Sequence, residues 1–258
     1  MRGVTIDTMA LRGSGIVTIA QQARGHRFTL DSILLADFCR IKPRDRVLEA
    51  GAGTGIISLL LASRYPRITV TAIELDQEAA DLCRWNSHAN GFSERILVLQ
   101  QDIRTIGNRS RKEPFDVIVA NPPYLRTGSG RPSPSPGRRN ARQDSAGGLL
   151  AWTGLGKLLK NRGRFFLVLA AGRTAELLIT LRSEALEPKR MRLVHAHADR
   201  PASVVLIEAV KSAAPGMKII PPLIIHGPDG AYSKELQSLY DLTGATSPDD
   251  PTRPLSPS

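Results

Sequence analysis

A glycine-rich segment, Glu49-Ala50-Gly51-Ala52-Gly53-Thr54-Gly55, places the tightest constraint on how this chain can fold. It follows an apolar run that predicts a strand, Arg46 to Ala50, and precedes a run that predicts a helix, Ile56 to Ser63. Glycines let the backbone turn tightly and approach a ligand, which the N-terminus of the next helix then faces. The segment therefore predicts the first strand–turn–helix unit of a ligand-binding α/β sheet.

The pattern on either side extends this unit into a three-layer α/β domain with a mostly parallel sheet. Further strands are expected over 68–73, 96–99, 115–120 and 164–169, and helices over 77–89, 149–159 and 174–183. Two late strands, 191–196 and 203–210, predict an antiparallel pair that closes the sheet.

The chain is expected to have three parts: an N-terminal β extension over 1–30, the α/β domain over 31–244, and a disordered tail over 245–258. Residues 14–29 alternate loosely, which predicts one or two short strands with a turn near Arg24-Gly25. Asp31 is the expected N-cap of the helix that follows.

Composition excludes several classes of protein. Two cysteines are too few for a disulfide framework or a zinc site, and His195 and His197, expected on one strand face, lack a third metal ligand. The chain has no apolar run of membrane-spanning length and no signal-peptide pattern, so a cytoplasmic protein is expected. Lys plus Arg number 35 against 24 acids, a net charge of +11, which favours a polyanionic partner unless it reflects genome composition.

Three acids follow successive predicted strands, and ligands of open α/β sheets bind at these carboxyl ends. Glu49 precedes the glycine turn, where it would repel a pyrophosphate and attract an amino group. Glu74 can accept hydrogen bonds from both hydroxyls of a ribose, and Asp102 can meet an adenine ring. Any one of these three acids could instead be an ordinary helix N-cap. For a fourth acid nearby, Asp76, the N-cap is the interpretation that we prefer.

A second motif, Asn121-Pro122-Pro123-Tyr124, follows the fourth strand of the series. The Asn121 oxygen and the Pro122 carbonyl can accept both protons of an exocyclic amino group, while Tyr124 offers a stacking face. The motif therefore predicts transfer to a planar amine that is positioned by hydrogen bonds and needs no strong general base.

The acids and the glycine turn resemble the S-adenosylmethionine site of class I methyltransferases, whose fold is Rossmann-like. The Asn-Pro-Pro-Tyr motif resembles that of amino-methyltransferases acting on adenine N6, cytosine N4 or a glutamine side chain. The runs HRFTLDSILLA, from His26, and PLIIHGPDGAYS, from Pro222, resemble bacterial tRNA(Val) adenine-37 N6-methyltransferases.

This resemblance implies two groups of site residues. S-adenosylmethionine would be held by Glu49, Gly51, Ala52, Gly53, Gly55, Glu74, Leu75 and Asp102. The target adenine, in an RNA that is expected to be a tRNA, would be held by Asn121, Pro122, Pro123 and Tyr124.

The chain departs from the family in the loop after Tyr124, which is rich in Arg, Pro, Ser and Gly, and in its Pro/Ser/Asp tail. The loop's charge favours contact with RNA phosphates over a merely solvated loop. The candidate RNA-binding residues are Arg27, Arg126, Arg138, Arg139 and Arg142.

Two other functions fit the motifs. A release-factor glutamine N5-methyltransferase shares Asn-Pro-Pro-Tyr, although that family usually carries a separate helical N-terminal domain. A non-catalytic RNA-binding protein could also keep the fold, but the intact acids argue against it. Trp85 and Trp152 are expected to pack in the core, Cys39 and Cys83 to be small buried hydrophobes, and the oligomeric state stays open.

Overall fold

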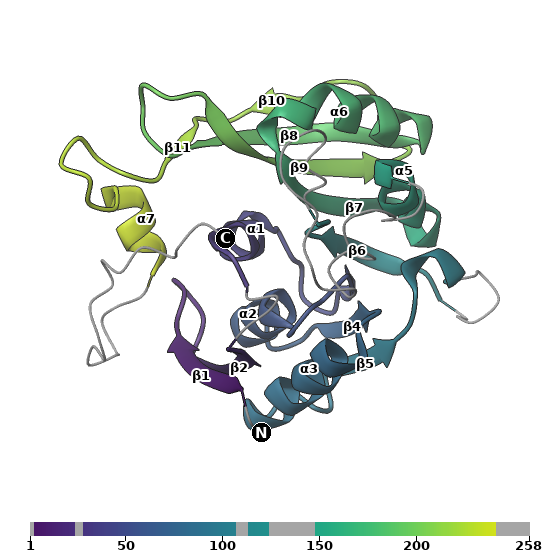
Figure 1. The fold of residues 1–258 in the computed structure, drawn as a ribbon. Coiled ribbons are helices and arrows are strands. Elements are labelled where there is room, and N and C mark those ends of the chain that lie inside the picture. The colour runs from purple at the N-terminus through teal and green to yellow at the C-terminus, as the bar shows by residue number, and fades with distance from the viewer. Residues whose placement is uncertain (1–2, 24–27, 107–112, 124–147, 241–258) are drawn as a thin grey trace, which may run out of the picture.

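The computed structural model describes residues 3–23, 28–106, 113–123 and 148–240, whose strands form a nine-stranded sheet and a separate two-stranded hairpin (Figure 1). The strand order of the large sheet is β10-β8-β9-β7-β6-β3-β4-β5, and β11 pairs with β8 outside this path. The strands of the hairpin are β1 (Val4–Met9) and β2 (Val17–Gln22). Those of the sheet are β3 (Arg46–Ala50), β4 (Thr69–Glu74), β5 (Ile96–Gln100), β6 (Phe115–Ala120), β7 (Leu159–Ala170), β8 (Leu186–His195), β9 (Ala202–Lys211), β10 (Lys218–Ile219) and β11 (Leu223–Ile224).

Strand direction confirms the predicted mixed sheet. The five strands from β3 to β7 pair in parallel, while β9 lies between β7 and β8 and is antiparallel to both. The two late strands thus close the sheet as an antiparallel pair. Because β9 reverses direction, β8 again ends at the same edge as the parallel strands.

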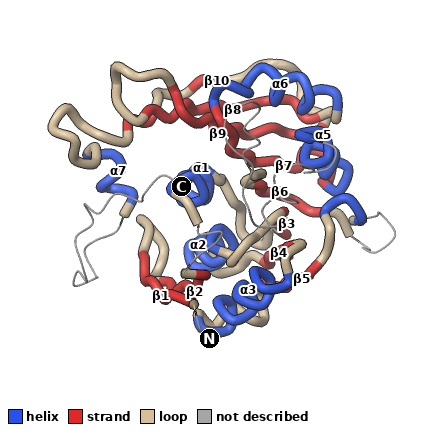
Figure 2. The backbone as a smooth tube through the Cα atoms, in the orientation of Figure 1, coloured by secondary structure: helices blue, strands red, loops and turns tan. Residues whose placement is uncertain are grey.

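Helices cover both faces of the sheet, which gives the expected three layers (Figure 2). Phe165 and Phe166, adjacent on β7, are fully buried in different core clusters, as expected of a strand covered on both sides. No helix in the described ranges is long and apolar enough to cross a membrane. One face carries α1 (Leu30–Phe38), α2 (Ile56–Arg64), α3 (Gln77–Ala89) and α7 (Lys234–Leu239), and the other carries α5 (Gly148–Thr153) and α6 (Thr174–Ser183).

Two asparagines one turn apart, Asn86 on α3 and Asn90 at its C-cap, join the N-terminal hairpin to the domain. The Asn86 Oδ1 atom accepts a hydrogen bond from the backbone N–H of Ala20 at 2.6 Å, and its Nδ2 atom donates to the carbonyls of Ala20 at 2.9 Å and Thr54 at 2.8 Å. Asn90 likewise pairs with both backbone groups of Thr18, at 2.8 and 2.7 Å. The side chains of α3 therefore satisfy the outer edge of β2 as a neighbouring strand would.

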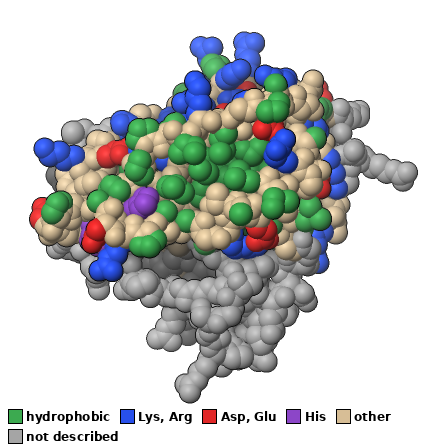
Figure 3. Space-filling view, turned by 90° about the horizontal axis from the view of Figure 1, so that it is seen from above, with side chains coloured by type: hydrophobic (Ala, Val, Ile, Leu, Met, Phe, Trp, Pro, Cys, Tyr) green, Lys and Arg blue, Asp and Glu red, His purple; other side chains and the backbone are tan. Residues whose placement is uncertain are grey.

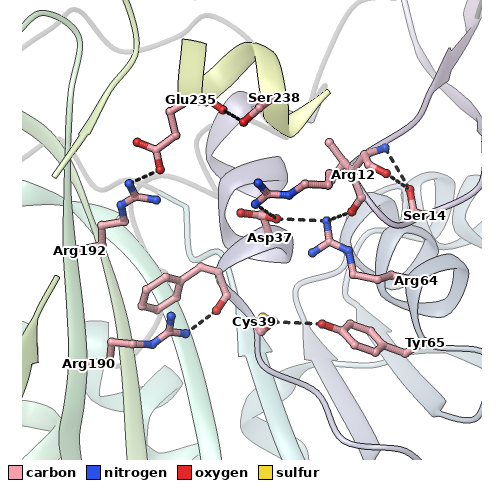
Figure 4. A network of polar contacts seen from close by, with 12 residues as sticks. Arg12, Ser14, Asp37, Cys39, Arg64, Tyr65, Arg190, Arg192, Glu235 and Ser238 are labelled. Carbon is pink, nitrogen blue, oxygen red and sulfur yellow. Dashed lines mark hydrogen bonds and ion pairs between the residues drawn. The ribbon is translucent and has the colours of Figure 1, made fainter. Parts of the chain in front are cut away.

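A network of ion pairs and hydrogen bonds holds the C-terminal end of α1 against the sheet (Figure 4). Arg190 on β8 donates to the Phe38 carbonyl at 2.5 Å, and its guanidinium lies 3.8 Å from the centre of the Phe38 ring. Asp37 pairs with Arg64 at 3.1 Å and with Arg12 at 3.8 Å. Three separate segments thus fix α1 in position.

The sheet ends at β10, a strand of only two residues, and short edge strands discourage pairing with other chains. Ile219 in this strand is 65% exposed.

Figure 3 looks onto the molecule from above the view of Figure 1. On the face that it shows, hydrophobic side chains gather in the middle, with charged groups around them.

Three local predictions were wrong, and one strand of the expected N-terminal β extension was not predicted. Helix α1 begins at Leu30 after Thr29, so Asp31 is not its N-cap but lies in the first turn, where its charge suits the helix dipole. The expected helix over 149–159 divides into α5 and a 3-10 helix, Gly154–Leu158, before β7 begins. Strand β8 ends at His195, so His197 lies beyond it. The partner of β2 is β1, which was not predicted; the expected turn near Arg24-Gly25 and the expected disordered tail lie outside the described residues.

Candidate active site

Strand register brings the predicted motifs together at the carboxyl edge of the sheet. Ala50 at the end of β3 pairs with Ile73 on β4 and with Ala120 on β6. The glycine turn follows β3, Glu74 is the last residue of β4, and Asn121 follows β6. The residues that the sequence places in separate motifs are therefore neighbours in space.

The glycine turn can be built only with glycine at two of its positions. Gly51 and Gly55 have φ of +68° and +90°, which side chains rarely adopt. A Cβ atom added at Gly51 would lie 2.8 Å from the ring of Trp152, and one added at Gly55 would lie 2.5 Å from the Cys83 sulfur. Trp152 and Cys83 thus support the turn from behind.

Glu49 lies beneath the glycine turn and is 2% exposed. Its Oε2 atom accepts hydrogen bonds from both the backbone N–H (2.9 Å) and the hydroxyl group of Ser58, on the first turns of α2. Burial raises the pKa of this carboxyl from 4.5 to about 7, against the opposing effect of the Ser58 hydrogen bonds. The Glu49 carboxyl is therefore only partly ionised near pH 7, and a cation placed beside it would favour the ionised form.

Glu74 uses both carboxylate oxygens to hold the turn. Its Oε2 atom accepts from the N–H of Gly53 at 2.7 Å, and its Oε1 atom accepts from the N–H of Asp76 at 2.9 Å. Each carboxylate oxygen can accept a second hydrogen bond, so the group can also accept from a diol. Leu75, directly after it, is 59% exposed and offers an apolar surface beside the carboxylate.

The carboxylate of Asp102 is paired with the side chain of Arg104, two residues later. The Arg104 Nε atom donates to both carboxylate oxygens, at 2.9 and 2.8 Å, and the backbone N–H of Arg104 donates at 2.8 Å. The Arg104 hydrogen bonds hold the pKa of Asp102 below its usual range. Asp76 is an N-cap, as preferred from the sequence, since its side chain accepts from the N–H of Ala79 at 2.9 Å.

Asn121 stands half-buried at the end of β6, followed by a buried Pro122 and an exposed Pro123. Its Nδ2 atom donates to the hydroxyl oxygen of Ser32 on α1, at 2.9 Å. The NH2 end of the amide is thus bonded to Ser32. The site combines the carbonyl end of this amide with the glycine turn and the carboxylates of Glu49 and Glu74.

A family model described as "Methyltransferase small domain" matches residues 27–132. A tRNA1(Val) (adenine(37)-N6)-methyltransferase of Erwinia tasmaniensis is 34% identical over 211 residues, which are 79% of this chain and 82% of the relative. One of Porphyromonas gingivalis is 30% identical, covering 89% of this chain and 92% of the relative. The chain belongs to the tRNA1(Val) (adenine(37)-N6)-methyltransferase family.

A solved structure of another methyltransferase has the same fold as this chain. A predicted O-methyltransferase from Agrobacterium tumefaciens superposes with a TM-score of 0.66 at 23% identity, covering 81% of this chain and 94% of that one. The three-layer, Rossmann-like methyltransferase fold expected from the sequence is therefore confirmed.

Part of the expected site of this methyltransferase lies outside the described residues. These are the stacking residue of the motif and all five candidate RNA contacts, namely Tyr124, Arg27, Arg126, Arg138, Arg139 and Arg142.

Sequence reasoning missed three residues that the structure adds to the site: Ser32, Ser58 and Trp152. Ser58 follows the turn by one helical turn, a spacing that could have indicated contact with Glu49. Trp152 was expected to pack in the core, and it does pack, but against the glycine turn. No local signal links Ser32 to Asn121, because they are 89 residues apart.

Proposed function

We propose that this protein transfers the methyl group of S-adenosylmethionine to the exocyclic N6 of an adenine in RNA, at the position named for its relatives, adenine 37 of tRNA1(Val). The observation that carries the proposal is the placement of Asn121 directly beside the glycine turn, with its amide NH2 already bonded to Ser32. An amide carbonyl at this place suits a substrate that presents N–H donors.

The residues of the glycine turn fit S-adenosylmethionine. When bound, this cofactor supplies an electrophilic methyl group on a positively charged sulfur. Glu74 has unused lone pairs for the ribose hydroxyls, and Leu75 offers an apolar surface to the adenine ring. Glu49 would meet the amino group of the methionine part, which favours its ionised form. Asp102 would face the adenine edge in competition with Arg104.

The reacting amine is held by hydrogen bonds. The Asn121 Oδ1 atom accepts one N–H of the target adenine, and the Pro122 carbonyl accepts the other. Two acceptors favour a tetrahedral nitrogen, whose lone pair would attack the methyl carbon as the bond between that carbon and the positively charged sulfur breaks to leave a neutral thioether. The surplus proton of the amine would pass to solvent. Positioning of the amine therefore does most of the work.

The decisive experiment compares the wild type with Asn121→Ala, using an unmodified tRNA1(Val) transcript and labelled S-adenosylmethionine. We expect Asn121→Ala to lower the transfer rate at least 100-fold while the cofactor affinity, measured by calorimetry, changes less than twofold. Unimpaired turnover in the variant would refute the role of Asn121. Methylation of a release-factor glutamine in place of the tRNA would assign the protein to the rival function.

A further inference from the structure

A hydrogen bond between two distant segments engages the NH2 end of the Asn121 amide and leaves the amide oxygen free to accept from a ligand. The Ser32 side chain, on the first turn of α1, is 6% exposed, and its oxygen accepts from the Asn121 Nδ2 atom at 2.9 Å. The two residues lie 89 positions apart, so only the packing of α1 against the sheet brings them together.

The orientation of this amide matters because its two ends have opposite hydrogen-bonding character. The terminal torsion of an asparagine side chain is broad and roughly twofold, so rotation exchanges the oxygen and the NH2 group. An amino group as substrate offers only N–H donors in the plane of its ring. With the Asn121 NH2 turned outward, donor would face donor, and the substrate would lose one of its two acceptors.

A serine hydroxyl can either accept or donate a hydrogen bond, and in the structure Ser32 accepts, which supports the productive orientation of the amide. Its hydroxyl oxygen accepts the NH2 group, which would otherwise stay partly buried without an acceptor. The helix that carries Ser32 is itself held, because Arg190 bonds the carbonyl of Phe38 and Asp37 pairs with Arg64 (Figure 4). A rigid helix keeps the acceptor in place between turnovers.

We propose that Ser32 is a positioning residue, which holds the Asn121 amide with its oxygen toward the amino group of the substrate. This inference rests on the proposed function, because it assigns Asn121 the task of accepting an N–H from the amine. It adds a residue from α1, outside the Asn-Pro-Pro-Tyr motif, to the groups that set the geometry of transfer.

The test uses three variants at one position and one matched control. Ser32→Ala removes the acceptor, Ser32→Cys keeps nearly the same shape but has a weak acceptor, and Ser32→Thr keeps the hydroxyl. We expect kcat to fall 10- to 100-fold in Ser32→Ala and Ser32→Cys and to stay within threefold in Ser32→Thr, while KM for S-adenosylmethionine is unchanged in all three. The control is Ser87→Ala, a serine that is also buried on a helix and whose hydroxyl has no hydrogen-bond partner in the described structure.

A second readout does not depend on activity. In ¹⁵N-labelled protein, the side-chain NH2 signal of Asn121, assigned by its disappearance in Asn121→Asp, should shift and lose protection from exchange in Ser32→Ala and Ser32→Cys, but not in Ser87→Ala. Full activity in Ser32→Cys, or equal losses of kcat and cofactor affinity in Ser32→Ala, would overturn the inference. If the wild type is inactive on the tRNA, the proposed function is refuted. If the Asn121 NH2 signal nevertheless shifts and loses protection in Ser32→Ala, the hydrogen bond between the two residues is still confirmed.

Discussion

Replacing Glu49 by Gln should stabilise the cofactor-free protein and weaken its binding of S-adenosylmethionine. The Glu49 carboxyl is buried under the glycine turn, and its pKa is raised to about 7 because burial disfavours the ionised form. Glutamine has nearly the same shape and keeps an oxygen that can accept both hydrogen bonds from Ser58. It removes the charge and replaces one carboxylate oxygen by an NH2 group.

The size and sign of the effect follow from this pKa. The pKa of this carboxyl rises from 4.5 to about 7 on folding. At about 1.4 kcal/mol per pKa unit, folding therefore disfavours its ionised form by about 3 kcal/mol relative to the unfolded chain. The folded protein binds the extra proton between these two values, so the contribution of Glu49 to the stability of the wild type falls as pH rises from about 4.5 to about 7 and is then level. The Gln amide must bury its own NH2 group, which costs about 1–3 kcal/mol without an acceptor, so the net gain above pH 7 should be about 0–2 kcal/mol.

Urea unfolding of the cofactor-free protein at pH 5.5 and pH 8.5 measures this gain, with Glu74→Gln as the matched control. We expect Glu49→Gln to exceed the wild type at pH 8.5 by more than at pH 5.5. The dissociation constant for S-adenosylmethionine should rise in the wild type as pH falls below 7 and stay level in Glu49→Gln over the same range, because only the carboxylate attracts the cofactor's amino group. A variant less stable than the wild type at pH 8.5 would refute this reasoning.

Three further predictions test the surroundings of the site. Gly55→Ala should lower the free energy of unfolding by about 2–4 kcal/mol, because its φ is +90° and the new Cβ would lie 2.5 Å from the Cys83 sulfur; adding Cys83→Ala should recover part of the loss in urea titrations. Asn86→Ala should cost about 2–4 kcal/mol in the same assay, since it leaves the backbone groups of Ala20 without partners, and a loss below about 0.5 kcal/mol would contradict that role. Cys39 and Cys83 are buried and burial raises the pKa of both thiols, so Ellman's reagent at pH 8 should find neither until denaturant is added; prompt labelling would show that the core opens readily.

Much of the fold could be predicted because its signals are local. The bounds of β3, α3 and β6 match the sequence prediction, since each element is an apolar or amphipathic run that ends at a glycine, a capping residue or a proline. The order of strands and helices then fixed the class of sheet. Strand β1 escaped prediction because its partner edge is chosen by tertiary pairing, and an isolated two-stranded hairpin has little pattern of its own.

The candidate site divides in the same way. Glu49, Glu74 and Asn121 could be found because each stands at the carboxyl end of a predicted strand, and parallel strands bring these ends together. The hydrogen bond between Ser32 and Asn121 depends on how α1 packs, which no spacing in the sequence encodes. The Arg104 side chain on Asp102 was also missed, because a charge two residues away can equally point to solvent.

The pairing of β2 with Asn86 and Asn90 has a consequence for folding during synthesis. The chain emerges from the ribosome N-terminus first, so β2 is available long before α3, whose amides satisfy its outer backbone groups. Until residue 90 has been released, the hairpin has a polar edge with only water to bond. The same amide of Asn86 also donates to the carbonyl of Thr54, so one side chain of α3 links the hairpin to the glycine turn. One of the two earliest strands of the protein can therefore complete its outer edge only after α3 has left the ribosome.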